Sequence, residues 1–480
     1  MNSLVKEIEG LVDVNKQTYE ELSDFLWNNP ETGLVEYKSA NKIKSLLKEK
    51  GFSIEDSVGE IETAFIATYG SGKPIIGLSC EYDALPGLSQ KSDTFEKCAV
   101  EEGAPGHACG HNLLGSGVVG AALVIKDYMN KHNLKGTIKV LGTPSEERDS
   151  SKVFLGRDGY FDDLDLALTW HPESTNRIWD GGSLANTIAV FNFKGKSAHA
   201  AAAPHLGRSA LDAVELMNVG VNYLREHIIP EARVHYAYLD VGGNAPNVVQ
   251  PTASIYYFIR SPKIEDSTEI YERIIDVAKG AALMTQTQVE VNLKVALADF
   301  VPNRALSKIL YNSIVEYGVP KFDERDAEVA TKYFETFDPD TKNAGIKAVE
   351  QFYGRNDSRS MLQTHLASKM RPYNGEFGEV EVITSDVGDL SHYTPTAQMF
   401  MATAAIGTPL HSWQMAAQAN SSLGKKGLEA TVGALSLTAI KILENPSLID
   451  EIQKEFKTEV GEYNTTLPRE IKIRNPKLED

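Results

Sequence analysis

The order of predicted strands and helices changes near residue 187, and this change constrains the fold of the 480-residue chain more than any other feature. Before it, apolar strand-like runs alternate with helical patterns, which indicates an α/β sheet. Between 187 and 302 the order becomes strand, helix, strand, strand, helix, strand, which is the split order of ferredoxin-like domains. We therefore expect α/β architecture, a central mixed sheet flanked by helices, formed by residues 1–186 and 303–480. Residues 187–302 would be an inserted α+β domain whose first strand covers 188–200.

Several apolar segments of the larger domain run directly into residues that can bind a metal ion or move a proton. In open α/β sheets, ligands bind at the carboxyl ends of the strands, so we expect these side chains to meet in one cleft. The segments are 74–87, 136–147, 164–172 and 399–407, and the residues that follow or end them are Glu81, Asp83, Glu146, Glu147, His171 and His411.

The stretch "GHACGHN" (106–112) adds a soft donor to this set. Cys109 and His111 flank one glycine, and a bent loop could direct sulfur and imidazole to one ion. Alone the pair is a weak signal, because a buried Cys usually packs as a small hydrophobe and a lone His usually makes ordinary polar contacts. The pair Glu146-Glu147 could likewise be a solvated acidic loop, and Asp83 a turn-forming acid.

Taken together, the candidates favour a metal centre. A thiolate, imidazoles and a carboxylate suit Zn²⁺ or Mn²⁺ better than Mg²⁺ or Ca²⁺, which prefer oxygen ligands. Cys109, His111, one glutamate, His171 and His411 would supply five ligands, which exceeds one tetrahedral ion. The sequence therefore predicts two divalent ions that share a bridge.

Charge and composition exclude some partners. The formal net charge of −18 repels phosphate backbones and anionic lipid, so we expect neither nucleic acid nor a membrane surface as a partner. No segment approaches the roughly 18 consecutive apolar residues of a membrane span, and the first 27 residues mix charges among apolar positions, unlike a signal peptide. Three cysteines cannot build a disulfide framework for this length, and a cytoplasmic location is expected.

Seven motifs, spread in order over nearly the whole chain, together resemble the M20 metallopeptidase/amidohydrolase family. The chain is most similar to the Cys-containing amidohydrolase branch of that family, although it has Glu81-Tyr82-Asp83 where the branch has Asp-x-Asp. It also has Asn112 where the branch has Asp, and Ser145 where the branch has Ala. The motifs are "EYDALPG", "GHACGHN", "GTPSEE", "TWHP", "GKSAHAAAAPHLGRSA", "NVVQP" and "GTPLHS".

The resemblance implies a role for each candidate residue. Glu146 would be the general base, and Asp83 would orient a histidine ligand. The inserted domain would act as a lid and dimerisation domain. The implied metal ligands are Cys109, His111, Glu147, His171 and His411.

Three residues of the inserted domain are further candidates. His199 resembles the family histidine that reaches a neighbouring subunit's active site and stabilises the developing oxyanion; otherwise it is a surface histidine in an Ala-rich turn. Asn247 lies on a turn, and Arg260 at a strand end could clamp a substrate carboxylate with two hydrogen bonds, although most such arginines are merely solvated.

The activity implied by the resemblance is metal-dependent hydrolysis of the amide bond of an N-acyl amino acid. The most specific expectation is p-aminobenzoyl-glutamate, cleaved to p-aminobenzoate and glutamate. The alternatives are a dipeptidase, a general N-acyl-amino-acid amidohydrolase, or a non-catalytic metal-binding subunit that needs a partner. A homodimer is expected, with a related A subunit as a further partner.

The remaining features are predicted to be structural. Residues 318–380 are polar with helical stretches, an elaboration on the main domain, and the charged tail 466–480 would be ordered only where it docks. We expect packing, surface or structural roles for Cys80, Cys98, His107, His205 and His392.

Overall fold

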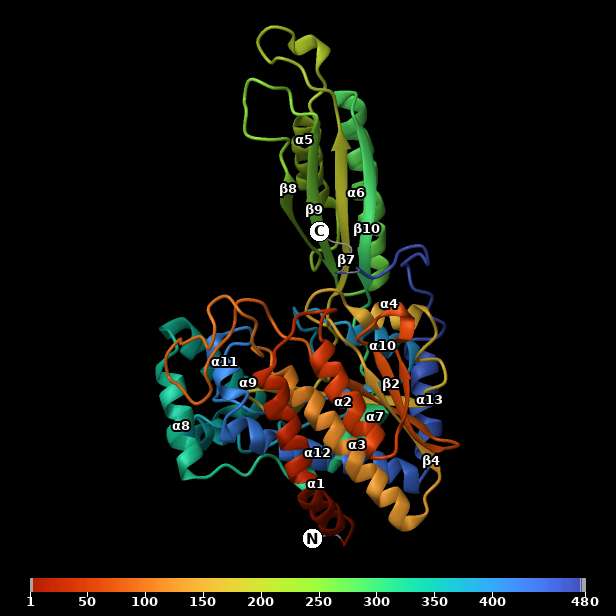
Figure 1. Ribbon diagram of the computed structural model, residues 1–480, viewed down its shortest axis with the longest axis vertical. Coiled ribbons are helices and arrows are strands. Elements are labelled where there is room, and N and C mark those ends of the chain that lie inside the picture. The colour runs from red at the N-terminus through yellow and green to blue at the C-terminus, as the bar shows by residue number, and fades with distance from the viewer. Residues whose placement is uncertain (1–2, 475, 477–480) are drawn as a thin grey trace.

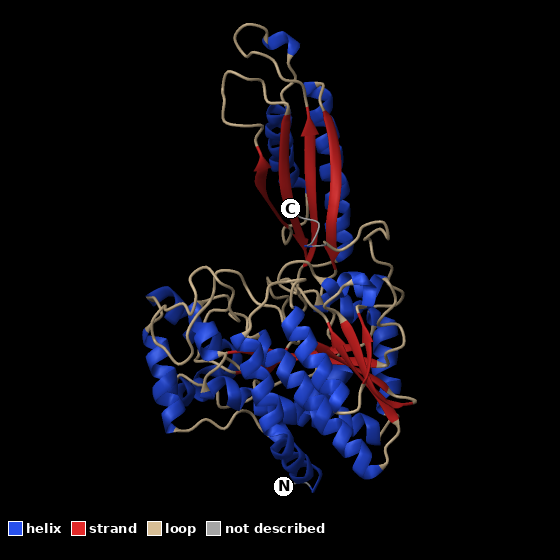
Figure 2. Ribbon diagram, in the orientation of Figure 1, coloured by secondary structure: helices blue, strands red, loops and turns tan. Residues whose placement is uncertain are grey.

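The computed structural model describes residues 3–474 and residue 476, and it shows a broad body from which a narrow domain projects (Figure 1). In the body, helices surround one sheet, whereas the projecting domain is a sheet backed by helices (Figure 2). The body is formed by chain on both sides of the projecting domain. This arrangement confirms the predicted fold class.

The body sheet has seven strands in the spatial order β1-β2-β4-β3-β5-β11-β6. Its central strands β4, β3, β5 and β11 are parallel, while β2 and β6 run antiparallel to the strands beside them. Parallel strands place their carboxyl ends at one edge, so the segments that follow them meet there. The bounds are β1 Ser53–Asp56, β2 Phe65–Ser71, β3 Ile75–Cys80, β4 Gly136–Gly142, β5 Leu166–Glu173, β6 Arg177–Ile178 and β11 Thr396–Ala402.

Side chains along each strand point alternately to the two faces of the sheet, and both faces are buried. In β5, Leu166, Leu168 and Trp170 pack with α3, whereas Ala167 packs on the opposite face against α4 and α10. Gly117 of α3 approaches Trp170 so closely that an added Cβ would lie 2.8 Å from the indole Nε1. The helices α1 and α12 pack on α3 in turn. The bounds are α1 Ser3–Asn28, α2 Tyr37–Glu49, α3 His111–His132, α4 Ser151–Arg157, α10 Val387–Tyr393 and α12 Ser422–Glu444.

The projecting domain is antiparallel, with the order β10-β7-β9-β8 and with α5 and α6 on one face, as the split pattern predicts. The first strand is shorter than expected: it ends at Lys194 instead of continuing to Ala200. Its neighbours β9 and β10 begin opposite Lys194, so residues 195–200 have no strand to pair with and form a loop. The bounds are β7 Ala185–Lys194, α5 Ala210–Leu224, β8 Arg233–Asp240, β9 Thr252–Ser261, α6 Ile264–Thr285 and β10 Gln288–Leu297.

The chain after residue 303 completes the body and then returns to the base of the projecting domain. Arg157 donates hydrogen bonds to the carbonyl oxygens of Pro468 and Ile471, and Arg474 pairs with Asp149, so the tail docks as far as residue 474. Residues 475 and 477–480 lie outside the described residues. None of the helices between residues 3 and 474 is long and apolar enough to cross a membrane. The remaining bounds are α7 Arg304–Tyr317, α8 Glu324–Glu335, α9 Pro339–Thr364, α11 Trp413–Gln418 and α13 Leu448–Glu459, with short 3₁₀ turns at Val58–Glu60, Pro204–Leu206 and Arg225–His227.

Candidate metal centre

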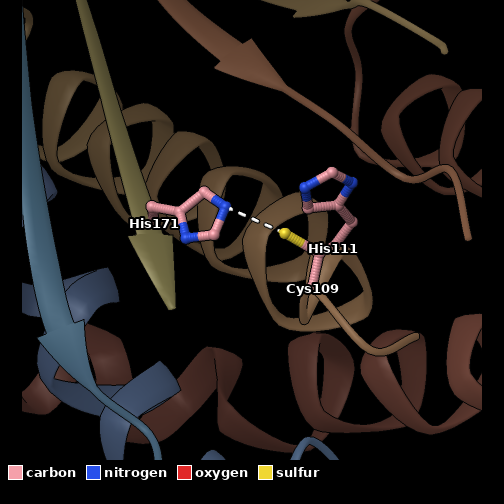
Figure 3. A group of neighbouring side chains, drawn as sticks. All are labelled: Cys109, His111 and His171. Atoms are coloured by element: carbon pink, nitrogen blue, oxygen red, sulfur yellow. Dashed lines mark hydrogen bonds between the residues drawn. The ribbon is translucent and has the colours of Figure 1, made fainter. Parts of the chain in front are cut away.

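The Cys/His motif lies at the start of the buried helix α3. Gly110 caps this helix with φ 82°, a left-handed backbone that glycine adopts without strain, and the turn places the Cys109 and His111 side chains on the same side. The sulfur of Cys109 is 3.3 Å from Nε2 of His171, which β5 delivers from the adjacent part of the sheet edge (Figure 3).

Three groups of possible metal ligands lie at this edge, and within each group the donor atoms are all within 4.8 Å of one another. The groups are Cys109, His111 and His171; Cys109, Glu147 and His411; and Glu81, His111 and Glu146. Cys109 belongs to the first two groups and His111 to the first and third. The structure therefore brings together the five residues expected as ligands and places Glu146 beside them. A donor shared by two groups could contact two neighbouring ions at once.

Asp83 connects two of these residues. Its Oδ1 accepts a hydrogen bond of 2.8 Å from Nδ1 of His111, and its Oδ2 accepts one of 3.0 Å from the backbone N–H of Glu147. Because Nδ1 of His111 carries the donated hydrogen, a neutral ring has its lone pair on Nε2, which faces the other donors. His171 is oriented similarly, since its Nδ1 donates to the carbonyl oxygen of Pro172 at 2.8 Å.

The donor set fits a metal ion by a second criterion, hydrogen-bond satisfaction. Among the described residues, His111 Nε2 and Glu147 Oε1 are buried without any hydrogen-bond partner. Burying such atoms unpaired is costly, and atoms aimed at a shared space are satisfied when a cation occupies it. Carboxylate, imidazole and thiol donors of this kind are chemically suited to a divalent transition metal.

The electrostatics separate the two adjacent glutamates. Burial, followed by the charges of Glu81 and Glu147, holds the pKa of Glu146 well above its usual range. Burial would also raise the pKa of Glu147, but the hydrogen bond from His411 and the charge of His111 outweigh it and lower that pKa. Environments that push two carboxyl pKa values apart are typical of paired acid–base and charge-bearing roles.

His411 differs from the other donors in exposure and backbone. It lies in the loop between β11 and α11, with φ 58° and a side chain 52% exposed, and its Nε2 is 3.3 Å from Glu147 Oε2. Its backbone N–H donates to the carbonyl oxygen of Ala108, which ties this loop to the Cys/His motif. A non-glycine residue in the left-handed region is costly and is typical of functional sites.

The three candidates of the inserted domain do not join this cluster. His199 and Asn247 lie on neighbouring exposed loops, where the Ala200 N–H donates to the Asn247 carbonyl oxygen at 2.9 Å. The loop between β7 and α5, which contains His199, is at the end of the domain remote from the body (Figure 1). Arg260 lies near the opposite end of the sheet, paired with Asn186 at the start of β7.

Two buried ionisable residues that the sequence analysis did not identify contact the candidate metal centre or the residue directly before its glutamate pair. Lys152 of α4 is fully buried, and its Nζ lies 2.7 Å from Glu81 Oε1 and 2.6 Å from Asp386 Oδ1. Glu36 is also fully buried and accepts a hydrogen bond from the backbone N–H of Ser145, directly before the glutamate pair. The only sequence signal for Lys152 is a lone charge beside the apolar "VFLG".

His107 and His392, for which we expect structural roles, each contact a backbone carbonyl oxygen. The Nε2 of His107 is 3.1 Å from the carbonyl oxygen of Leu26, and that of His392 is 2.9 Å from the carbonyl oxygen of Asp299. Cys80, Cys98 and Cys109 are free thiols; Cys80 and Cys109 are buried and Cys98 is half-buried.

Comparison with known proteins agrees with this geometry. Residues 77–419 match the model of peptidase family M20/M25/M40, which confirms the predicted resemblance. The chain is 39% identical to a subunit of the p-aminobenzoyl-glutamate hydrolase of Escherichia coli strain K12, over 98% of this chain and 99% of that protein. It is 26% identical to the mouse (Mus musculus) Xaa-Arg dipeptidase, over 92% of this chain and 89% of that protein.

A solved structure has the same fold. A dinuclear metal-binding peptidase of the M20 family from Bacillus subtilis superposes with a TM-score of 0.55 and 16% identity, over 88% of this chain and 98% of that one.

Proposed function

The chain belongs to peptidase family M20/M25/M40 and is a hydrolase of amide bonds, and we propose that it cleaves p-aminobenzoyl-glutamate into p-aminobenzoate and glutamate. The observation that carries the substrate is the 39% identity to the E. coli hydrolase subunit, which extends over nearly the full length of both proteins. Because the similarity extends over nearly the full length, it includes the inserted domain and the loops around the site. Such loops usually determine which substrate a protein binds.

We assign two divalent cations to the site, held by Cys109, His111, Glu147, His171 and His411. Support comes from the two donor groups that share Cys109 and from the unpaired buried atoms of His111 and Glu147. The thiolate favours Zn²⁺, while the carboxylate and imidazoles also accept Mn²⁺. Free thiols are kept reduced in the cytoplasm, and all three cysteines are free, so we place the protein there.

Bound there, the cations would polarise the amide carbonyl and acidify an attacking water. Glu146 is the general base: its carboxylate takes the proton from the water and later gives it to the leaving nitrogen. Asp83 keeps the His111 ring in one tautomer and orientation.

His199 and Asn247 act on the site of a second copy of the chain. The backbone N–H groups of Ala201 and Ala202 donate to His199 Nδ1, so a neutral ring carries its hydrogen on Nε2 and can donate to a developing oxyanion. The position of this loop, remote from the chain's own donor cluster, favours action across a dimer (Figure 1). Arg260 would bind a substrate carboxylate from the opposite end of the same sheet.

The surface of the inserted domain suits such a dimer. Strand β8 is a sheet edge that exposes Tyr238 and Leu239, and α5 exposes Leu216, Val219 and Tyr223. The two elements are joined by a hydrogen bond that Asn218 of α5 donates to the Tyr238 hydroxyl. An exposed edge strand with apolar neighbours is a surface on which a second copy pairs symmetrically. A related A subunit remains a further partner, because the E. coli relative is named as one subunit of its enzyme.

The test is release of p-aminobenzoate by purified protein loaded separately with Mn²⁺ and Zn²⁺, with hippurate and dipeptides ending in arginine as competing substrates. We expect turnover of p-aminobenzoyl-glutamate, and we expect Glu146→Gln to keep its metal while turnover falls at least about a hundredfold. Wild-type activity in Glu146→Gln would remove Glu146 as the base.

The second candidate is a dipeptidase, favoured by the 26% identity to the mouse Xaa-Arg dipeptidase. Turnover of dipeptides alone would keep the metal centre and replace the substrate. No turnover of any substrate by fully loaded protein would favour a subunit that needs a partner.

A further inference from the structure

The ammonium group of Lys152 is buried between two carboxylates at the inner side of the metal centre. Its Nζ pairs with Glu81 Oε1 at 2.7 Å and with Asp386 Oδ1 at 2.6 Å, and Asp386 Oδ2 also accepts a hydrogen bond from the Lys152 backbone N–H at 3.1 Å. All three side chains are at least 98% buried. Burying three charges is expensive and seldom stabilises a fold, so the group calls for another explanation.

Glu81 connects this group to the metal centre. While its Oε1 faces Lys152, its Oε2 lies 3.5 Å from Nε2 of His111, too far for a good hydrogen bond. Nε2 has no hydrogen-bond partner among the described residues, and donor atoms of Glu81, His111 and Glu146 lie within 4.8 Å of one another. When the His111 ring is neutral, its Nε2 lone pair and the facing Glu81 oxygen repel each other, and a cation bound between them removes that repulsion.

We propose that Glu81 is a sixth protein ligand of the metal centre, that it binds the same cation as His111, and that Lys152 is the positioning residue that fixes its carboxylate. This inference rests on the metal centre assigned under the proposed function and adds to its ligand set. The length of the glutamate side chain lets its carboxylate reach Lys152 on one side and His111 on the other.

Asp386 holds Lys152 in place but does not face His111. It holds Lys152 at both the backbone N–H and Nζ, so the ammonium cannot turn away from Glu81. It thereby provides a matched control, because Glu81 and Asp386 are both buried carboxylates paired with the same lysine, and only Glu81 faces His111.

The experiment counts bound ions by calorimetric titration of metal-free full-length protein with Mn²⁺ and, separately, Zn²⁺. We expect Glu81→Gln, which keeps the side-chain size, to weaken binding of one ion by about 10- to 100-fold, the range seen when groups around a metal are removed. We expect Asp386→Asn, which acts only through Lys152, to weaken that ion less than Glu81→Gln does, while lowering the thermal unfolding midpoint. Wild-type affinity for both ions in Glu81→Gln would overturn the proposal.

His111→Ala distinguishes this failure from failure of the metal centre itself. If His111→Ala loses an ion and Glu81→Gln does not, Glu81 is not a ligand and the proposed function stands. If both variants bind two ions as the wild type does, the assigned centre is wrong and the proposal fails with it.

The positioning role of Lys152 has its own readout. Lys152→Met should weaken the same ion as Glu81→Gln, and the double variant should lose no more than the stronger single variant, because both changes remove one interaction. Independent, additive losses would overturn the positioning role. Cobalt-substituted Glu81→Gln, which does not depend on the folding of a lysine variant, should show altered d–d bands with the Cys109 thiolate charge-transfer band retained; unchanged d–d bands would argue against ligation.

Discussion

The carboxyl group of Glu36 is buried beside the turn that carries Glu146 and Glu147. Its Oε1 accepts a hydrogen bond from the backbone N–H of Ser145 at 2.9 Å, and its Oε2 accepts one from the Thr63 hydroxyl at 3.0 Å. Burial, then the charge of Asp83, raises the pKa of Glu36 to about 8. At neutral pH it therefore holds a proton that the unfolded chain would release.

This proton makes stability depend on pH. Because the pKa of Glu36 is raised on folding, its contribution is fully present below the unfolded value near 4.5 and is lost as the pH rises through about 8. Glutamine mimics the protonated form, so Glu36→Gln should be the more stable protein at pH 8, with a gain over wild type that grows by on the order of 2 to 4 kcal/mol from pH 5 to 8.

The measurement is the thermal unfolding midpoint of metal-free protein at several pH values from 5 to 8. Glu49→Gln, an exposed change at the end of α2, the helix that begins directly after Glu36, is the control and should follow the wild-type curve. Parallel curves for Glu36→Gln and wild type would show that Glu36 is ionised throughout.

At the scale of single residues, the sequence identifies the candidate metal ligands by residue type and spacing. It does not identify ionisable residues that the fold buries near them. His171 and Glu147 stand at the ends of apolar runs, Cys109 lies in the stretch 106–112, and the structure brings the three together. Lys152, Asp386 and Glu36 give no such signal, because Lys, Asp and Glu are almost never fully buried unless paired. Their partners are distant in the sequence: Lys152 and Asp386 are 234 residues apart.

At the scale of elements, the start of α3 determines how the Cys/His motif is presented. Gly110 has φ 82°, and an added Cβ would lie 2.9 Å from Met415 Cε and 3.0 Å from Pro172 Cβ. A side chain at this position would therefore suffer backbone strain and would also push against the segment that follows His171. Both effects would shift Cys109 relative to His111.

Gly110→Ala should therefore weaken metal binding at least about tenfold and cost about 1 to 3 kcal/mol of stability. Gly103→Ala is a matched control, since Gly103 has φ 76° but open space around its Cβ position. It should share the backbone strain and keep wild-type metal affinity in a titration. Equal metal affinities for the two variants would mean that the position of the Cys/His turn does not limit binding.

The helices and strands also show which structural features the sequence pattern predicts and which it does not. The split strand and helix order of the inserted domain follows from local periodicity, and the structure has that order. The end of β7 could not be read locally, because its neighbours begin opposite Lys194, a matter of register between distant segments. The helices α8 and α9 were predictable as helical stretches, yet their placement depends on contacts such as that of Tyr333 with Phe95.

At the scale of the whole molecule, the inserted domain separates residues that the proposed mechanism brings together. The donor cluster lies at the carboxyl edge of the body sheet, whereas the loop with His199 lies at the far end of the projecting domain (Figure 1). A second copy joined through β8 and α5 would bring a partner loop to each site. Under this arrangement a site is built from Glu146 of one subunit and His199 of the other.

Two inactive variants should therefore restore each other. Glu146→Gln and His199→Ala, co-expressed with different affinity tags and purified as a mixed dimer, form one site that lacks both groups and one that has both. Because the dimer has two equivalent sites, the mixed dimer should regain about half of the wild-type turnover of p-aminobenzoyl-glutamate, while each parent dimer stays nearly inactive. If His199 served its own chain, each site of the mixed dimer would lack one group and the activity would stay at the parental level. A mixed dimer confirmed by native mass spectrometry that remains inactive would therefore rule out action across the dimer.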